Sequence, residues 1–443
     1  MELLIKGGLL VDPAQGLQGI YDLQINNGIV ANVAPNIDTG GKNFINVHNL
    51  LVIPGLVDMH THLREPGFEE KETVATAARA AAAGGYSSIT AMPNTNPVMD
   101  SKTIVEHLTL LAMRAGLVRI WPVGAISKGS RGVELAEIEE MVRAGARAVT
   151  DDGRGVANDG LLREAMLYCK NLGIPLLEHC EDEALAGEGQ MHEGQLAIRL
   201  GLPGIPAAAE SAMLIRDLRL AAETGARLHV MHLSSSESVK IIRQAKADGV
   251  PVTAEVTPHH LLLTEEAVID LDARAKMKPP LRSAADRQAL CEGLRDGTID
   301  IIATDHAPHT AAEKSRGFRD APFGVVGLET AFPVLFTNLV RTGFLTLSSL
   351  VGKMSRNPAA ILGIPHGGLA PGMAADLTII DLKKEYILDS RIFHSRGKNT
   401  PFDGWRVYGR PVLTLVGGYP AEPFTKIFDE VLRTNGQLRN IST

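Results

Sequence analysis

The stretch Leu51-Val52-Ile53-Pro54-Gly55-Leu56-Val57-Asp58-Met59-His60-Thr61-His62-Leu63-Arg64 carries the central fold signal of the chain. Its apolar first half predicts a strand buried on both faces, as in a parallel sheet. Because side chains alternate along a strand, His60 and His62 are expected to point the same way, where two imidazoles can bind one metal ion. Arg64 follows as a fixed cation that suits a substrate carboxylate. The alternative is that two histidines simply end a strand.

Composition places the chain among ordinary globular proteins. Its 443 residues are 45% hydrophobic and 21% charged, enough for a large barrel and a smaller domain. The net charge of -7 argues against nucleic acid as a partner, and no apolar run is long enough to predict a membrane span. Residues 1–7 lack the pattern of a signal peptide, and three distant cysteines suggest a reducing compartment. We therefore expect a cytoplasmic protein.

Both ends of the chain are rich in strand and turn patterns. Residues 3–12 predict a hairpin with its turn at Gly7-Gly8, and residues 21–30 predict another with its turn at Asn27-Gly28. Similar strand patterns occur at 375–381 and 407–416. Because each set alone is too small for a core, we expect one small β-sandwich domain built from both termini, residues 1–52 and 366–443.

Between the termini, residues 53–365 alternate apolar strands with helical patterns. Helical stretches include 70–83, 207–223 and 236–247. This alternation indicates βα units, and eight of them fit an α/β fold of the TIM-like (β/α)8 barrel type. An open doubly wound sheet is the alternative, but the Gly-x-Gly-x-x-Gly fingerprint of dinucleotide binding is missing after the first strand. The strand candidates are 51–60, 86–92, 118–124, 146–152, 174–179, 227–233, 250–257 and 299–305.

Polar residues gather where these strands end, which is the catalytic rim of such a barrel. Taken singly, each has an ordinary explanation: a histidine meeting solvent, a turn at Asp151-Asp152-Gly153, or a helix cap at Thr304-Asp305-His306. Together they would require repeated coincidence on five strands. Four imidazoles and two carboxylates suit a pair of divalent ions, most simply Zn²⁺. The residues are His60, His62, Asp152, His179, His232 and Asp305.

Two longer motifs carry a family resemblance. Residues 58–67 resemble the first-strand signature of the cyclic amidohydrolases. Residues 303–309, Ala-Thr-Asp-His-Ala-Pro-His, and 322–330, Pro-Phe-Gly-Val-Val-Gly-Leu-Glu-Thr, closely resemble those of bacterial dihydroorotases. The likeness extends from Val52 to about Ala360. It implies a metal-dependent enzyme that reversibly cyclises N-carbamoyl-L-aspartate to (S)-dihydroorotate in de novo pyrimidine biosynthesis.

The resemblance also implies residue roles. His60, His62 and Asp305 would bind one zinc ion, and His179 and His232 the other, with Asp152 and a hydroxide as bridges. Asp305 would also be the catalytic acid and base. The substrate-binding residues it implies are His62, Arg64, Asn94, Lys278, His309, Phe323 and Gly324.

Two positions separate this chain from other relatives. Hydantoinases and allantoinases usually carry a carboxylated lysine on strand four, whereas residues 146–152 contain no lysine. An aspartate is therefore expected to bridge the two metal ions. Asp152 is the favoured candidate, and Asp151 is the less favoured one. Bacterial dihydroorotases usually have asparagine in contact with substrate where this chain has Lys278. That lysine either meets the anionic substrate or points to solvent.

Other interpretations stay open on sequence alone. One is an allantoinase or hydantoinase, and another is a non-catalytic scaffold for aspartate transcarbamoylase, although all six metal ligands are present. We also expect a homodimer. The polar segment 310–323 is either a lid over the substrate or an ordinary surface loop.

Overall fold

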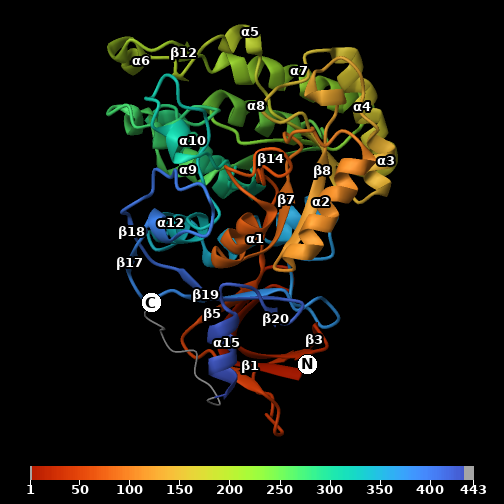
Figure 1. Cartoon of the computed structure of the whole chain (residues 1–443), viewed down its shortest axis with the longest axis vertical. Helices are drawn as coiled ribbons and strands as arrows, with labels where there is room; N and C mark the ends of the chain where they lie inside the picture. The colour runs from red at the N-terminus through yellow and green to blue at the C-terminus, as the bar shows by residue number, and fades with distance from the viewer. Residues whose placement is uncertain (1, 434–443) are drawn as a thin grey trace.

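The computed structural model describes residues 2–433. Two bodies are visible in Figure 1: a ring of helices and strands forms the upper part, and a sheet that contains the N-terminal strand lies below it. The fold is the predicted (β/α)8 barrel with an additional β domain built from both termini.

All eight predicted barrel strands are present and run parallel. The ring closes where Thr61 bridges to His306, and the amide of His62 donates to the His306 carbonyl at 2.9 Å. Oδ1 of the buried Asp58 accepts from the amides of His60 and Thr304, each at 3.1 Å, which ties the first strand to the last. In sheet order the strands are β15 (Ile301–Ile302), β14 (Val252–Val256), β13 (Leu228–Val230), β10 (Leu176–Glu178), β9 (Ala148–Val149), β8 (Arg119–Gly124), β7 (Tyr86–Ala91) and β6 (Leu56–Asp58).

The helices around the barrel bury one apolar stripe each against the strands. The predicted helices 207–223 and 236–247 agree with the structure to within a residue. The one predicted from Glu70 begins only at Val74, because Thr73 caps it in a reciprocal pair with Thr76. The outer helices include α1 (Val74–Ala83), α2 (Lys102–Ala115), α3 (Ile138–Arg143), α4 (Asp159–Leu172), α7 (Ala208–Thr224), α8 (Ser236–Ala247) and α10 (Ala284–Asp296).

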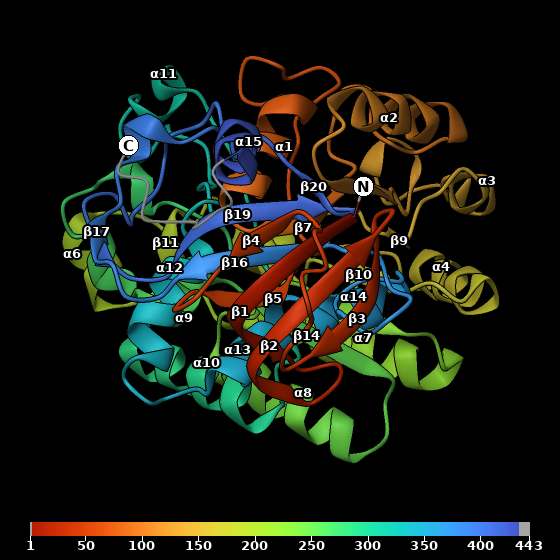
Figure 2. The ribbon, with the colours of Figure 1, turned by 90° about the horizontal axis from the view of Figure 1, so that it is seen from below.

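The second sheet joins the two ends of the chain. Figure 2, seen from below, places the red N-terminal strands beside the blue C-terminal ones, with barrel helices around them. Helix α15 (Thr425–Arg433) adds Phe428 and Val431 to the core of this sheet. Its strand order is β20 (Tyr419–Pro420), β19 (Arg410–Val416), β16 (Leu377–Asp381), β5 (Leu51–Pro54), β1 (Glu2–Asp12), β2 (Leu17–Asn26) and β3 (Ile29–Ala34), with β4 (Phe44–Asn46) also paired to β1.

One of the two predicted hairpins is wrong. Residues 3–12 form a single strand, β1, in which Gly7-Gly8 is a bulge rather than a turn. The register between β1 and β2 shifts at the bulge, between Ile5 and Gly8, and the real turn follows Asp12. The hairpin at Asn27-Gly28 is present, with both residues at positive φ (50° and 80°).

The predicted first strand, 51–60, is two strands in different sheets. β5 pairs with β1 and β16, and β6 pairs with β7. Gly55 separates them at a point where a Cβ atom would lie 2.2 Å from Oγ of Ser87. The boundary expected after Val52 therefore falls inside β5. At the other end, the segment around β17 (Tyr386–Ile387) and β18 (Arg406–Val407) packs on the barrel core instead of on the terminal sheet.

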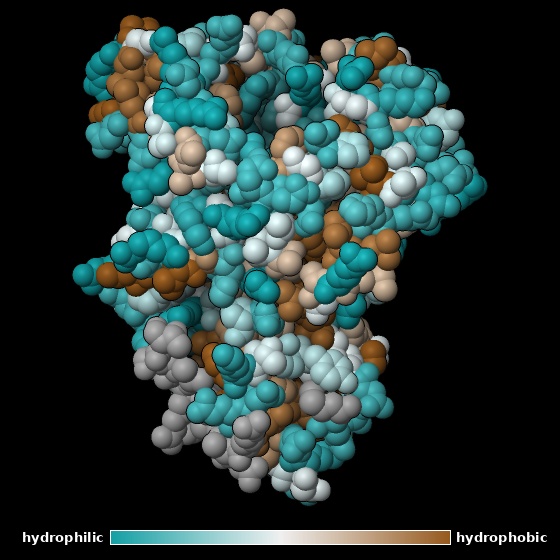
Figure 3. Space-filling model, viewed as in Figure 1, coloured by the Kyte–Doolittle hydropathy of each residue, from teal (hydrophilic) through white to brown (hydrophobic). Residues whose placement is uncertain are grey.

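The surface in Figure 3 is mostly hydrophilic, with apolar side chains in small separate groups. Among residues 2–433 no helix combines the length and apolar character needed to cross a bilayer.

Candidate metal centre and substrate pocket

The structure brings the six predicted metal ligands together at the C-terminal rim of the barrel. All six side chains are buried. Nε2 of His62 lies 3.1 Å from Oδ1 of Asp305 and 3.4 Å from Oδ2 of Asp152, and Nε2 of His60 lies 3.4 Å from Oδ1 of Asp152. Two ligands of one tetrahedral zinc ion are about 3.3 Å apart at ordinary bond lengths. The cluster therefore has the spacing of metal ligands.

Hydrogen bonds fix which nitrogen of His60 and His62 faces the cluster. Nδ1 of His60 donates to the carboxylate of Glu255 at 2.6 Å, and Nδ1 of His62 donates to Oδ1 of Asn94 at 2.9 Å. Each Nε2 is thereby left as a lone-pair donor toward Asp152 and Asp305. The buried Nε2 of His60 makes no hydrogen bond, which is the condition expected of a metal ligand.

His179 and His232 form the second half of the cluster. Nδ1 of His179 lies 2.9 Å from Nε2 of His232 and 3.7 Å from Oδ1 of Asp152. His60, Asp152 and His232 form one group whose ligand atoms could hold an ion, and His60, His62 and Asp305 form another. Asp152 belongs to the first group and contacts His62 of the second, which suits a bridging carboxylate.

Asp151, the neighbour of Asp152, binds the backbone and a hydroxyl group instead of facing the imidazoles. Oδ1 of Asp151 accepts from the amides of Ile126 and Ser127 at 2.9 and 3.0 Å, and its other oxygen accepts from the Ser127 hydroxyl. These bonds fix the loop after β8 and engage both oxygens of Asp151 away from the imidazoles. Asp152, in contrast, faces the imidazoles.

Three of the predicted site residues adopt backbone conformations that cost energy. Arg64, His232 and Asp305 have φ of 61°, 31° and 47°. The left-handed region costs a non-glycine residue about 1–2 kcal/mol. His232 and Asp305 lie just beyond strands β13 and β15, and Arg64 lies in the loop that follows β6. Such strain is concentrated at functional sites in proteins.

The carboxylates and imidazoles of the cluster shift one another's pKa values. Burial would raise the pKa of Asp305, but the imidazoles of His60, His62 and His232 outweigh burial and lower it to about 2. Burial and the neighbouring His232 lower the pKa of His179 to about 4. Ionised carboxylate and neutral imidazole are the forms that bind metals. His60 differs from His179, because burial would lower its pKa but Glu255, Asp152 and Asp305 raise it well above its usual value, so a metal ion must displace a proton from His60.

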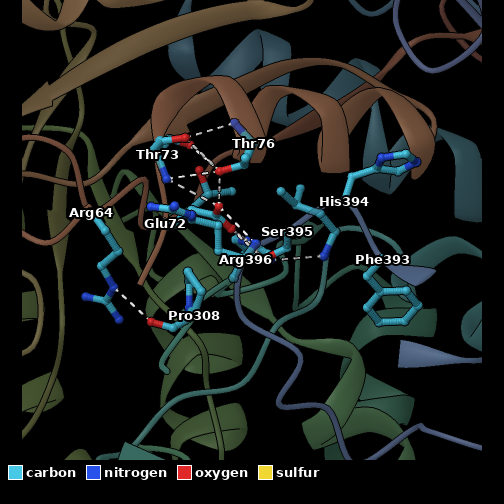
Figure 4. Close-up of polar contacts among 12 residues, drawn as sticks. Arg64, Glu72, Thr73, Thr76, Pro308, Phe393, His394, Ser395 and Arg396 are labelled. Carbon is cyan, nitrogen blue, oxygen red and sulfur yellow. Dashed lines mark hydrogen bonds and ion pairs between the residues drawn. The ribbon is translucent and has the colours of Figure 1, made fainter. Parts of the chain in front are cut away.

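A cavity of about 400 Å³ opens above the cluster. The predicted substrate-binding residues all line it. Nε of Arg64 donates to the Pro308 carbonyl at 3.3 Å, and Nε2 of His309 donates to the Phe323 carbonyl at 2.7 Å. The first of these bonds is visible in Figure 4, where the guanidinium group points away from helix α1. The lining residues are His62, Arg64, Asn94, Asp152, Gly153, His179, His232, Lys278, Asp305, Ala307, His309, Pro322, Phe323 and Gly324.

Two lining residues have contacts that the sequence did not suggest. Nδ2 of Asn94 donates to Asp152 at 3.2 Å while its oxygen holds His62, so this amide orients two ligands. The Lys278 ammonium group pairs with the buried carboxylate of Glu181 at 2.5 Å. Lys278 therefore faces the cavity with a partner, and does not simply extend into solvent.

Several supporting residues were missed by sequence reasoning. Glu255, which binds His60, also accepts from Nε2 of His229 at 3.1 Å. Its sequence signal was a charged residue inside the buried strand β14. Figure 4 shows Glu72 between the start of α1 and Ser395, whose hydroxyl donates to it at 2.5 Å. Nε2 of His306 reaches the same carboxylate at 3.4 Å. This contact links strand β15 to α1 and had no local sequence signal.

Comparison with known proteins adds independent evidence. A family model described as dihydro-orotase-like matches residues 49–238. Dihydroorotase of Pelotomaculum thermopropionicum is 51% identical over 94% of this chain and 98% of that protein. Dihydroorotase of Caldanaerobacter subterraneus subsp. tengcongensis is 47% identical over 97% of this chain and 100% of that protein. Among solved structures, L-hydantoinase (dihydropyrimidinase) from Arthrobacter aurescens matches with a TM-score of 0.85 at 29% identity, covering 94% of this chain and 95% of that one.

Proposed function

The chain belongs to the dihydroorotase family, and from this premise we propose that it reversibly cyclises N-carbamoyl-L-aspartate to (S)-dihydroorotate and water. The observation that carries the proposal is the rim cluster, in which His60, His62, His179, His232, Asp152 and Asp305 approach one another beneath a cavity that contains Arg64. The reaction belongs to pyrimidine biosynthesis, as the family name implies.

We propose that two zinc ions occupy the cluster. His60, His62 and Asp305 would hold one, His179 and His232 the other, and Asp152 would touch both. When bound, such ions polarise the ring carbonyl and lower the pKa of water to near neutrality. The unpartnered Nε2 of His60 and the hydrogen bond from Nδ1 of His62 to Asn94 support this assignment.

Asp305 is the proposed proton carrier. In hydrolysis its carboxylate takes a proton from the attacking water and gives it to the ring nitrogen as the C–N bond breaks. In ring closure it takes a proton from the carbamoyl nitrogen and returns it to the leaving oxygen. Its position beside His62 and at the cavity wall supports this role.

Arg64, Asn94 and His309 are proposed to bind the carboxylate that remains outside the ring. Arg64 is the permanent cation among them, and one bond to the Pro308 carbonyl orients its guanidinium group. The backbone at Phe323 and Gly324 would complete the pocket.

The proposal for Asp305 is tested by Asp305→Asn and Asp305→Ala, with the exposed Asp270→Asn as control. Zinc content and dihydroorotate hydrolysis are measured on the same preparations. We expect turnover to fall by about 10³-fold in both Asp305 variants, a loss typical of a missing general acid and base. An Asp305 variant that keeps both its zinc and its turnover would contradict the role.

A hydantoinase-type activity is the competing proposal, since a hydantoinase shares the fold. Residues 146–152, which contain strand β9, include Asp152 and no lysine, which favours dihydroorotate as substrate. Comparing turnover of dihydroorotate, allantoin and hydantoin on one preparation separates the two.

Three buried, unpaired cysteines support a reducing compartment, and we place the enzyme in the cytoplasm. We also propose a homodimer and an association with aspartate transcarbamoylase. Light scattering of the protein alone and mixed with that partner tests both.

A further inference from the structure

A lysine that the proposed mechanism does not use lies buried beside the pocket. Lys276 is 2% exposed. Its ammonium group donates to Oε1 of Gln190 at 2.5 Å and to the carbonyls of Phe318, Arg319 and Ala321 at 2.7, 2.9 and 2.7 Å. Three of its acceptors thus belong to one short stretch of chain.

All of these acceptors are uncharged oxygens. A buried ammonium group is costly unless hydrogen bonds replace its hydration. Burial lowers the pKa of Lys276 to about 8, and the ring of Phe323 lies 4.5 Å from the ammonium nitrogen. The lysine therefore needs these carbonyls in place, and the carbonyls lose their donors if the lysine is removed.

The stretch belongs to residues 310–324, here called the rim segment, which includes the predicted lid. It begins with the short helix α11 (Ala311–Lys314). A second buried lysine, Lys314, donates to the carbonyls of Pro322 and Gly324, both at 2.9 Å. The amide of Gly324 donates back to the Lys276 carbonyl at 3.0 Å. Backbone and side chain of Lys276 thus hold the end of the rim segment together.

The end of the rim segment is also a wall of the pocket. The Phe323 carbonyl accepts from His309, and Phe323 and Gly324 both line the cavity. Gly324 has φ of 124°, and a Cβ atom there would lie 2.8 Å from Cβ of Ala307. The close approach of Gly324 to Ala307 leaves this wall little room to shift toward the barrel. Residues 318–321 lead directly into the wall, so the bonds that hold them also help to set its position.

We propose that Lys276 is a positioning residue whose ammonium group holds the rim segment against the barrel and so places the Phe323–Gly324 wall for the substrate. This inference rests on the proposed function, which identifies the cavity as the binding site for dihydroorotate. It predicts that loss of the ammonium group loosens the rim segment and weakens substrate binding, while the proposed metal ligands and Asp305 keep their places.

The test compares Lys276→Met with the zinc-loaded wild-type enzyme by hydrogen exchange and by steady-state kinetics. We expect faster exchange confined to the rim segment. We also expect KM for dihydroorotate to rise about 10-fold, as when one well-placed hydrogen bond is lost, with kcat changed less than about threefold. If Lys276→Met does not fold, Lys276→Gln keeps two N–H donors and should show the same changes at smaller size.

The matched control is Lys353→Met. Lys353 is also buried, and its ammonium group donates to the Ile299 carbonyl at 2.8 Å, before the start of β15 and away from the pocket. This variant should leave the rim segment's exchange and KM unchanged. Unchanged exchange of the rim segment in the folded Lys276 variants, or a KM rise no larger than in Lys353→Met, would overturn the proposal. Absence of dihydroorotate turnover in the wild type would defeat the proposed function instead, and the exchange data would still decide the role of Lys276.

Discussion

Nδ1 of His60 lies 2.6 Å from Oε1 of Glu255, and this one bond sets the chemistry of the opposite side of the imidazole ring. The carboxylate keeps the proton on Nδ1 and leaves Nε2 free for a metal. Neither His60 nor Glu255 is more than 1% exposed, so water does not replace the bond. Glu255 holds His229 with its other oxygen.

Replacing Glu255 with glutamine should weaken zinc binding by about 10- to 100-fold, because an amide orients the ring less firmly and lowers its basicity. Titration with a competing chelator measures the affinity directly. Glu292→Gln, on the exposed face of α10, is the control. Equal zinc affinity of Glu255→Gln and wild type would show that the bond is only structural.

Arg64→Met should act on the substrate carboxylate alone. We expect KM for dihydroorotate to rise about 100-fold, the loss of a charge-assisted pair of hydrogen bonds. Hydrolysis of dihydrouracil, which has the same ring without the carboxylate, should change little. Steady-state kinetics on both substrates, with exposed Arg131→Met as control, checks this. An equal loss on the two substrates would contradict the assignment.

Lys278 and Glu181 should behave as a coupled pair. Lys278→Asn introduces the residue expected from the family resemblance but leaves the Glu181 carboxylate buried without its cation. We therefore expect Lys278→Asn to lower kcat/KM more than the double variant Lys278→Asn/Glu181→Gln, with a coupling of about 1–2 kcal/mol. A double-mutant cycle of kcat/KM measures it. Additive effects would mean that the two side chains act independently.

Glu329 should make stability depend on pH. Burial raises the pKa of Glu329 to about 8, although the amides of Ser395 and His394 partly offset this. A carboxyl group with a raised folded-state pKa stabilises the fold below its unfolded pKa of about 4.5, and that stabilisation is lost as pH rises toward 8. Between pH 6 and 8.5, the free energy of unfolding of wild type should fall by about 2 kcal/mol relative to Glu329→Gln. Denaturant melts at both pH values measure this, and parallel behaviour of the two proteins would refute it.

Sequence patterns predicted the barrel because its signal is repeated. Strand candidates such as 174–179 and 299–305 were found because each is a mostly apolar run followed by a polar end. Parallel strands buried on both faces require apolar runs. The error at 51–60 has a physical reason. Two strands of different sheets meet end to end at Gly55, and both are apolar, so the run shows no break. The bulge at Gly7-Gly8 was mistaken for a turn, because glycine suits both.

Candidate site residues at the ends of barrel strands could be recognised from the sequence. Residues that hold them in place through partners remote in the sequence could not. His179 and Asp305 each follow a barrel strand, which marks them in the sequence. Glu181, Glu72 and Lys276 act through partners remote in sequence, as when Lys276 reaches Ala321. Such contacts arise only when the barrel closes.

The proposed function requires that the rim cluster binds metal and that the metal-loaded protein hydrolyses dihydroorotate. Zinc content and dihydroorotate hydrolysis, measured together on the purified protein before and after chelation, test this directly. We predict two zinc ions per chain, loss of turnover on their removal and recovery when zinc is restored. Protein that takes up no zinc, or that takes it up and leaves dihydroorotate unchanged, would contradict it.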